Sequence, residues 1–291
     1  MTPDPIERAA GLACFHNPTE IVPLDGGITN VNLKLRDGDR QFVVRLGNDI
    51  HDHGVLRWNE LALSRAAEAE GISPGVFHHE PGVLVLDFIP SVALDEAGVC
   101  KPQNIDRIVD LIAKAHRGLG RHLSTPVLSF WPFQVNQTYM TRLRAVGSRH
   151  AAVLTQLEQD AAVLQAATGP VEMVIGHNDL LAANILDDGD RLWLIDWEYG
   201  GFNTPLFDLA GLSGNNGMSA DQDHAMLARY FGRPAEDQWQ AFMAMKCVSL
   251  MRETLWSMTS ELHSEIDFDY AAYTEENLDR FRTAFRNFRS S

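Results

Sequence analysis

Three polar residues in the second half of the chain have the types and the spacing that phosphoryl transfer needs. Asp179 lies five residues before Asn184, so one loop can carry both, and Asp196 follows further along the chain. Phosphoryl transfer requires a carboxylate near the attacking hydroxyl and oxygen ligands for the magnesium ion that neutralises the phosphates. Asp179 suits the first role, and Asn184 and Asp196 suit the second.

A predicted β-hairpin would bring these residues together. Apolar runs at 184–186 and 192–195 flank the segment 187–190, whose Asp-Asp-Gly-Asp sequence is typical of a turn between two strands. The second strand would return Asp196 to the loop that carries the other two residues. Taken alone, the His-Asn-Asp stretch would be read as a surface turn and the later aspartate as the cap of a strand.

The first ninety residues are predicted to form strands around one helix. Val31, Leu33 and Leu35 alternate with polar neighbours, which indicates a strand with one buried face. A segment with apolar residues at helical spacing ends at Gly71, and Pro74 adds a second stop signal. The elements expected here are a hairpin of strands at 31–35 and 41–46 around a turn at 36–39, a helix at 57–70 and a strand at 83–89.

Beyond Pro90 the pattern changes to helical periodicity, interrupted by the hairpin region 174–197. We therefore predict an α+β fold in which residues 1–90 form a small domain with an antiparallel sheet and one main helix. Residues 91–291 are predicted to form a larger, mostly helical domain. Helical segments are expected near 105–115, 136–167, 219–231 and 235–260.

Composition argues against several classes of protein. The formal net charge is -15, whereas a nucleic-acid partner normally requires a basic stripe, so none is expected. No apolar run approaches the ~20 residues that cross a bilayer, and the N-terminal residues lack the basic and apolar segments of a secretion signal. The protein is therefore predicted to have no membrane span and to be cytoplasmic. Cys14, Cys100 and Cys247 form no CxxC pair, which argues against a zinc site or a disulfide framework.

The wider pattern resembles the aminoglycoside phosphotransferase and choline kinase superfamily. The superfamily motifs His-x-Asp-x-x-x-x-Asn, Ile-Asp-x-Glu and Asp-Leu-Ala match the chain at 177–184, 195–198 and 208–210. Within it, the chain most resembles the choline/ethanolamine kinases. The resemblance implies a two-lobed protein-kinase-like fold, with ATP as co-substrate and Mg²⁺ as metal ion. It also implies that the N-lobe binds the nucleotide and that the C-lobe carries the catalytic loop and the acceptor site.

The resemblance assigns roles to the residues of the catalytic segment. It implies that Asp179 is the catalytic residue and that the two candidate metal ligands hold Mg²⁺. His177 is expected to brace the backbone through hydrogen bonds rather than to act at the phosphates. Asp208 is expected to orient the catalytic loop, because a carboxylate can accept several backbone N–H groups. Glu198, two residues beyond the metal-binding aspartate, is expected to contact the acceptor or the ions.

Residues of the N-terminal part resemble the nucleotide site of choline kinases. Arg45 occupies the position of a strand cation that grips the phosphates, and Glu60 resembles its ion-pair partner. Most relatives use lysine there, whereas choline kinases resemble this chain in using arginine. Without the motif, these residues would be read as an exposed strand charge and a solvated helix face, and Gly26-Gly27 as a turn. The residues implied to bind the nucleotide, from the glycine loop, this pair and the hinge-like segment 86–90, are Gly26, Gly27, Thr29, Asn30, Arg45, Glu60, Asp87 and Ile89.

Aromatic residues in the C-terminal half resemble the acceptor site of choline kinases. Trp256 and Tyr273 lie where the family carries residues that line the choline site, and aromatic faces attract a quaternary ammonium group. Ordinary helix packing is the alternative interpretation of both residues. The family often has a second tryptophan three residues before Trp256, where this chain has Glu253. An added carboxylate favours a primary ammonium group such as that of ethanolamine, which can donate hydrogen bonds.

The sequence thus predicts an ATP-dependent phosphotransferase whose partner is a small, cationic alcohol, choline before ethanolamine. Thiamine, sugars and aminoglycosides are other acceptors within the superfamily. A catalytically silent, nucleotide-binding pseudokinase is the alternative of another class, but its usual sign, a missing base or metal ligand, is not found. A protein kinase is disfavoured because the chain lacks the GxGxxG loop.

Overall fold

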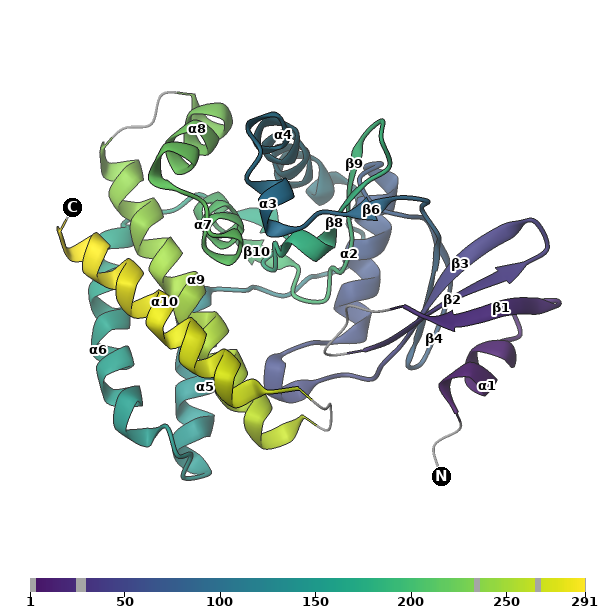
Figure 1. The fold of residues 1–291 in the computed structure, drawn as a ribbon, viewed down its shortest axis with the longest axis horizontal. Coiled ribbons are helices and arrows are strands. Elements are labelled where there is room, and N and C mark those ends of the chain that lie inside the picture. The colour runs from purple at the N-terminus through teal and green to yellow at the C-terminus, as the bar shows by residue number, and fades with distance from the viewer. Residues whose placement is uncertain (1–3, 25–29, 233–235, 265–267, 291) are drawn as a thin grey trace.

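An antiparallel sheet near the N-terminus is joined to a larger, mostly helical part (Figure 1). The structure, a computed structural model, describes residues 4–24, 30–232, 236–264 and 268–290. Strands predominate up to Asp87, and helices predominate after it. This arrangement confirms the mixed α+β fold that the sequence predicts.

The N-terminal sheet has five strands in the order β1-β2-β3-β5-β4, and every neighbouring pair is antiparallel. Strands β2 and β3 form the predicted hairpin. Gly38 lies in its turn with φ +58°, a conformation that favours glycine because it has no Cβ. The strands of this sheet are β1 (Pro18–Pro23), β2 (Val31–Asp37), β3 (Arg40–Leu46), β4 (Val76–Glu80) and β5 (Val83–Asp87).

The two faces of the sheet have different environments. On one face, Leu35 and Val44 are buried in a small core together with Phe15, which follows helix α1 (Pro5–Ala10). Successive side chains of a strand point to opposite faces. Arg45 therefore points away from this core, toward the side where helix α2 lies.

Helix α2 (Arg57–Ala69) connects the sheet to the helical part. Leu63 and Ala67 are completely buried, in the same hydrophobic core as the C-terminal helices. A Cβ atom at Gly200 would lie 2.5 Å from the Cδ1 atom of Leu63, so any other residue at this position would displace the Leu63 side chain. The C-terminal core thus anchors α2, while Glu60 on the same helix reaches strand β3.

The helical part is organised around α9, which packs against α5, α6, α7 and α10. Its predicted range, 235–260, agrees with the observed helix. The single segment predicted at 136–167 is instead two helices, α5 and α6, separated near Gly147, whose φ is +66°. The helices are α3 (Glu96–Val99), α4 (Pro102–Gly118), α5 (Pro132–Ala145), α6 (Ala151–Thr168), α7 (Pro205–Asn216), α8 (Ala220–Phe231), α9 (Glu236–His263) and α10 (Tyr270–Ser290).

Short strands form two small sheets within the helical part. The predicted hairpin is present as β8 (Ile185–Asp187) and β9 (Leu192–Leu194), which pair antiparallel. Strand β6 (Val92–Ala93) pairs with β8. Strands β7 (Val174–Gly176) and β10 (Gly201–Asn203) form the other pair. The segments before and after the β8–β9 hairpin therefore meet at its open end.

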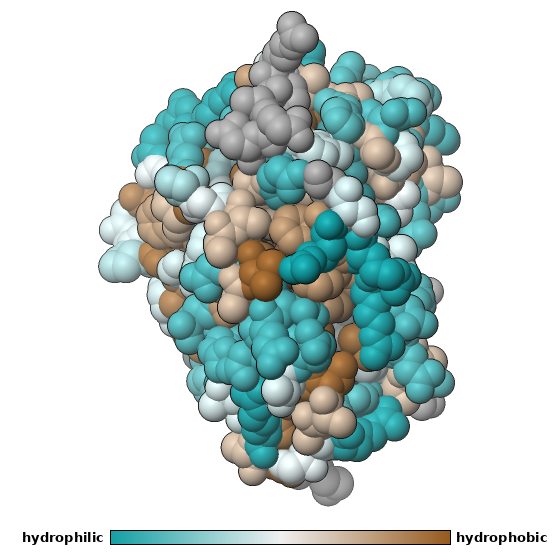
Figure 2. Space-filling view, turned by 90° about the vertical axis from the view of Figure 1, so that its left-hand side faces the viewer, coloured by the Kyte–Doolittle hydropathy of each residue, from teal (hydrophilic) through white to brown (hydrophobic). Residues whose placement is uncertain are grey.

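The surface of the helical part is mixed in polarity. Figure 2 shows the face on the left-hand side of Figure 1, where α6, α8 and the C-terminal end of α10 lie, with hydrophobic residues interspersed among hydrophilic ones. Within the described part of the chain, no helix has the length and apolar character needed to cross a bilayer.

Substitution of Leu63 by alanine tests whether α2 is anchored by the C-terminal core. Leu63→Ala removes a completely buried side chain, so we expect it to lower the free energy of unfolding by about 2–5 kcal/mol. Leu61→Ala, at a half-buried position of the same helix, should cost less. Urea unfolding followed by circular dichroism measures both. Equal losses in the two variants would contradict the proposed anchoring.

Candidate active site

The segment that leads to Asp179 is fixed by a buried carboxylate. Asp208, on α7, accepts hydrogen bonds from the backbone N–H groups of His177 and Asn178, both at 2.7 Å. The His116 ring on α4 also hydrogen-bonds to Asp208, at 2.8 Å. Burial opposes ionisation of Asp208, but these hydrogen bonds and the neighbouring histidines lower its pKa. The Asp208 carboxylate therefore orients the loop by binding the backbone N–H groups of the loop, as the sequence predicts.

Asn178 gives this loop its shape. Its φ is +66°, a left-handed conformation that asparagine adopts more readily than most residues. Its side-chain Nδ2 donates to the backbone oxygen of Tyr199 at 3.0 Å, and its Oδ1 accepts from Asn203 at 2.9 Å. The middle residue of the His-Asn-Asp stretch is thus held by β10 and by the segment before it.

His177 links the loop to the end of strand β9. Its ring Nε2 hydrogen-bonds to the backbone oxygen of Ile195 at 2.8 Å, and the ring packs 4.7 Å from that of Trp197. The side chain is almost completely buried, and burial lowers its pKa. The ring therefore braces the backbone at Ile195, as expected, and packs on the Trp197 side chain, so it holds Asp196 beside the loop.

The two candidate metal ligands lie at the open end of the β8–β9 hairpin. The Ile195 N–H donates to the backbone oxygen of Asn184 at 3.0 Å, and Asn184 Nδ2 donates to the backbone oxygen of Asp179 at 2.9 Å. Asp196 has φ +68°, a strained conformation for a residue with a Cβ, of the kind found at functional sites. An amide oxygen and a carboxylate are hard donors that suit Mg²⁺, so these two residues fit the expected ion.

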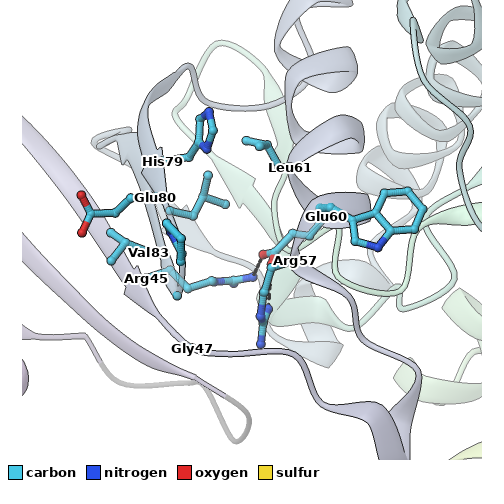
Figure 3. Close-up of a pocket in the computed structure, with 12 residues that line it drawn as sticks. Arg45, Gly47, Arg57, Glu60, Leu61, His79, Glu80 and Val83 are labelled. Carbon is cyan, nitrogen blue, oxygen red and sulfur yellow. Dashed lines mark hydrogen bonds and ion pairs between the residues drawn. The ribbon is translucent and has the colours of Figure 1, made fainter. Parts of the chain in front are cut away.

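Arg45 connects the sheet to both acidic elements of the site. Its Nη1 donates to Glu60 Oε1 at 2.5 Å and to Asp196 Oδ1 at 2.6 Å. Figure 3 shows Arg45 extending from β3 toward Glu60 on α2. Burial opposes ionisation of Asp196, but the charge and the hydrogen bond of Arg45 outweigh it and lower the pKa of this carboxyl group. The predicted Arg45–Glu60 pair is thus present, and it also holds the metal-ligand candidate.

The predicted phosphate-covering loop is described only at its end. Gly26, Gly27 and Thr29 lie outside the described residues, and Asn30 is the first residue after that gap. Asn30 Nδ2 donates to Glu198 Oε2 at 3.0 Å. Asn30 therefore ties the start of β2 to a residue of the C-terminal part.

Arg57 joins the same polar network, although the sequence did not single it out. From the first turn of α2, its Nη1 donates to Glu60 Oε2 at 2.7 Å and to Glu198 Oε2 at 3.2 Å, and its Nη2 donates to Asn30 Oδ1 at 2.6 Å. Its spacing of three residues from Glu60 was a signal available in the sequence, since such pairs share one helix face. Glu198 is thus held by Arg57 and Asn30.

A pocket of about 350 Å³ lies beside the Arg45–Glu60 pair, between α2 and the β4–β5 turn. Arg57 and Leu61 line it from the helix, and His79 lines it from strand β4 (Figure 3). None of the three residues of the predicted catalytic set lines this pocket. We therefore do not assign the reaction to it.

The hinge-like segment continues from strand β5. The Asp87 N–H donates to the backbone oxygen of Gly75 at 2.9 Å, and its carboxylate accepts from Arg40 Nη2 at 2.6 Å. The Ile89 oxygen accepts from Ser91 at 2.9 Å. Within the described residues, the Ile89 N–H donates no hydrogen bond to protein. Asp87 is thus occupied by the sheet, whereas the Ile89 N–H is available for a ligand.

The carboxylate of Asp179 contacts an arginine from α9. Arg252 Nη1 donates to Asp179 Oδ1 at 3.1 Å and to Glu253 Oε2 at 2.8 Å. Burial raises the pKa of Asp179 to about 7; Arg252 opposes this rise, and the negative charges of Glu253 and Asp196 add to it. The sequence predicted no role for Arg252 and no contact between it and the predicted catalytic residue.

The aromatic residues predicted to receive the acceptor lie next to one another. The rings of Trp256 and Tyr273 meet edge to face, with centroids 6.5 Å apart. Trp256 is only 4% exposed, and its Nε1 donates to the hydroxyl of Tyr199 at 2.9 Å. Tyr273 donates to Glu253 Oε1 at 2.8 Å. Glu253 therefore already has Tyr273 and Arg252 as partners, which weakens the expectation that it serves as an additional free carboxylate.

His53 also belongs to this aromatic cluster, although it precedes α2 in the chain. Its ring lies 5.2 Å from that of Trp256, and its nitrogens hydrogen-bond to the hydroxyls of Tyr139 at 3.1 Å and Ser260 at 3.2 Å. Burial lowers the pKa of His53 to about 3, and the charge of Arg252 adds to this. The ring is therefore neutral near pH 7. No motif in the sequence indicates that the segment before α2 reaches the C-terminal helices.

Solved structures with this fold include several phosphotransferases. A crystal structure of a choline/ethanolamine kinase family protein from Mesorhizobium loti matches with a TM-score of 0.78 and 26% identity, over 96% of this chain and 92% of that one. Choline kinase LicA from Streptococcus pneumoniae matches with a TM-score of 0.77 and 20% identity, over 95% and 97% of the two chains. A spectinomycin phosphotransferase, at 12% identity and a TM-score of 0.62, shares the fold.

Sequence comparisons agree with the structural ones. Protein LicA from Haemophilus influenzae is 34% identical over 271 residues, which cover 89% of this chain and 98% of the relative. Ethanolamine kinase 1 from Mus musculus is 23% identical over 303 residues, covering 88% and 81%. The family model for choline/ethanolamine kinase matches residues 21–228, which include the whole segment from His177 to Asp208. The chain therefore belongs to the choline/ethanolamine kinase family.

Proposed function

We propose that this protein transfers the γ-phosphate of ATP to the hydroxyl group of a small amino alcohol, with choline as the first candidate and ethanolamine as the second. In this proposal residues 1–90 bind the nucleotide, and residues 91–291 carry the catalytic loop and bind the acceptor. The observation that carries it is the arrangement of Asp179, Asn184 and Asp196. Backbone hydrogen bonds join the segments of all three, and Arg45 reaches Asp196 from the sheet.

Asp179 has the role of accepting or orienting the proton of the acceptor hydroxyl. Asn184 and Asp196 would hold Mg²⁺, which when bound supplies positive charge for the phosphates. Transfer then depends mainly on the positions of the groups and on electrostatic stabilisation. The buried supports of the loop, Asp208 and His177, keep these positions fixed.

The nucleotide site lies on the sheet side of the same network. Arg45 contributes the cation for the phosphates, and Glu60 fixes its guanidinium group. The glycine loop, including Gly26, Gly27, Thr29 and Asn30, would cover the phosphates. The hinge at Asp87 and Ile89 would meet the adenine through its backbone, and the N–H of Ile89 is the donor suited to that contact.

One observation favours choline over ethanolamine. Glu253 has Arg252 and Tyr273 as partners, so its carboxylate is not a free acceptor for a primary ammonium group. Trp256 and Tyr273 would face the ammonium group, and Glu198 would lie near the acceptor and the ions.

A panel of acceptors tests this proposal directly. ADP release from MgATP should be stimulated most by choline and to a smaller extent by ethanolamine. Thiamine, sugars and aminoglycosides at the same concentration should give only the background rate. The measurement is a coupled spectrophotometric assay with purified protein. Bound ATP without stimulation by either amino alcohol would contradict the proposal and favour a catalytically silent nucleotide-binding protein.

Replacement of Asp179 separates catalysis from nucleotide binding. Asp179→Asn keeps the size of the side chain but removes the carboxylate, so we expect kcat to fall by about 10²–10⁴-fold. The dissociation constant of MgATP should stay close to that of the wild type. Asp190→Asn, at an exposed position in the turn of the β8–β9 hairpin, is the matched control and should keep normal turnover. Unchanged kcat in Asp179→Asn would rule out the assigned role.

Replacement of Asp196 should instead affect metal-dependent binding. Asp196→Asn removes the anionic oxygen proposed to hold Mg²⁺, so affinity for MgATP should fall by about tenfold or more. Affinity for ATP measured in EDTA should change much less, because no metal takes part. Isothermal titration calorimetry with and without Mg²⁺ gives both values. Equal losses in the two conditions would assign Asp196 to the support of Arg45 rather than to the metal.

A further inference from the structure

Arg252 is a buried cation between the predicted catalytic residue and the acceptor side. Its side chain is only 5% exposed, and its Nη1 contacts both Asp179 Oδ1 and Glu253 Oε2. Among the described residues, Arg252 is the only hydrogen-bonding partner of the Asp179 carboxylate. The position of that carboxylate therefore depends on Arg252 more than on any other described side chain.

Arg252 is also linked to both aromatic residues of the predicted acceptor site, to Trp256 through Tyr199 and to Tyr273 through Glu253. Its guanidinium group lies 4.3 Å from the ring of Tyr199, and the Tyr199 hydroxyl accepts from Trp256. On the other side, Glu253 links it to the hydroxyl of Tyr273. The two residues predicted to receive the acceptor are thus connected to Asp179 through this one arginine.

The hydrogen bonding of Arg252 is unusual for a residue that only supports the fold. Its Nε and Nη2 atoms are buried and have no partner among the described residues, although buried donors are normally paired because an unpaired one costs free energy. The guanidinium group is thus held by its contacts with the two carboxylates and the Tyr199 ring, at the expense of its remaining donors. Such a local conflict is expected where a residue serves a site rather than the packing.

We propose that Arg252 is a positioning residue for the phosphoryl-transfer reaction, and this inference rests on the proposed function. By binding Oδ1, it turns the Asp179 carboxylate so that its other oxygen faces the acceptor hydroxyl. Through Tyr199 and Glu253 it also sets the distance between that carboxylate and the residues that receive the ammonium group. Glu253 acts as its counterion, so Asp179, Arg252 and Glu253 together carry a single negative charge when both carboxyl groups are ionised.

A set of variants on α9 tests this proposal. Arg252→Met keeps the length of the side chain but removes its charge and donors, so we expect kcat to fall by about 10²-fold, the effect of a misplaced reacting group. Its melting temperature should also fall, because two buried carboxylates lose their counterion. Glu253→Gln leaves the contact of Arg252 with Asp179 in place but alters the link to Tyr273, so its kcat should fall much less than that of Arg252→Met, while KM for the acceptor changes.

The double variant Arg252→Met/Glu253→Gln separates positioning from charge balance. It restores the net charge, so its melting temperature should recover toward that of Glu253→Gln. If Arg252 positions Asp179, kcat stays as low as in Arg252→Met. If kcat recovers to the value of Glu253→Gln, Arg252 is only a counterion and the proposal is overturned. Wild-type kcat in the single variant Arg252→Met would overturn it as well.

Lys246 provides a matched control on the same helix. Its Nζ lies 2.7 Å from Asp223, a carboxylate whose side chain is 2% exposed, away from the site. Lys246→Met should therefore lower the melting temperature without lowering kcat. An equal loss of kcat in this control would assign the effect of Arg252→Met to weakening of α9 and overturn the proposal.

The same assays distinguish failure of this inference from failure of the proposed function. All variants are measured with choline and with ethanolamine, together with MgATP binding by calorimetry. If wild-type protein binds MgATP but phosphorylates neither amino alcohol, the proposed function fails. If the wild type phosphorylates one of them and Arg252→Met does so at the same rate, only the role of Arg252 is lost.

Discussion

Buried negative charge is the physical constraint on which the candidate site depends. Phosphoryl transfer needs carboxylates close to the metal and the acceptor, yet a buried charge is costly unless it is paired. In this chain the positive charges come from Arg45 on β3, Arg57 at the start of α2 and Arg252 on α9, and each of them contacts two carboxylates. The carboxylate of Asp208 is instead stabilised by hydrogen bonds from two backbone N–H groups and from the ring of His116. Charge balance and the relative positions of the sheet, α2, the β8–β9 hairpin and α9 therefore depend on one another.

This charge balance changes how the acceptor side is understood. From the sequence, Glu253 looked like an added negative charge in a place where the family often has an aromatic residue. In the structure its neighbour Arg252 compensates that charge, and Tyr273 binds its second oxygen. The ring of His53 packs beside Trp256, and the Tyr199 hydroxyl accepts a hydrogen bond from it. The proposed acceptor side is thus a hydrogen-bonded cluster of aromatic and charged residues that contacts Asp179 through Arg252.

Local patterns in the sequence predicted several elements well. Alternating residues identified the β2–β3 hairpin, the turn residues at 187–190 identified the β8–β9 hairpin, and helical spacing identified α2 and α9. The strands β1 and β4 and the helices α1, α7 and α10 were not singled out, although α10 is 21 residues long. The prediction of one helix at 136–167 missed the break at Gly147, because the residues on both sides of this glycine favour a helix.

The sequence by itself determined the family-like motif, and with it the identity and order of Asp179, Asn184, Asp196 and their supports, because spacing within a loop and a hairpin is a local property. It also indicated the Arg45–Glu60 pair by resemblance. Only the tertiary structure decided that Arg57 reaches Glu198, that His53 packs on Trp256 and that Arg252 binds Asp179. The residues in these contacts are 73 to 203 positions apart along the chain. Such contacts arise from the packing of separate elements, which leaves no periodic trace in the sequence.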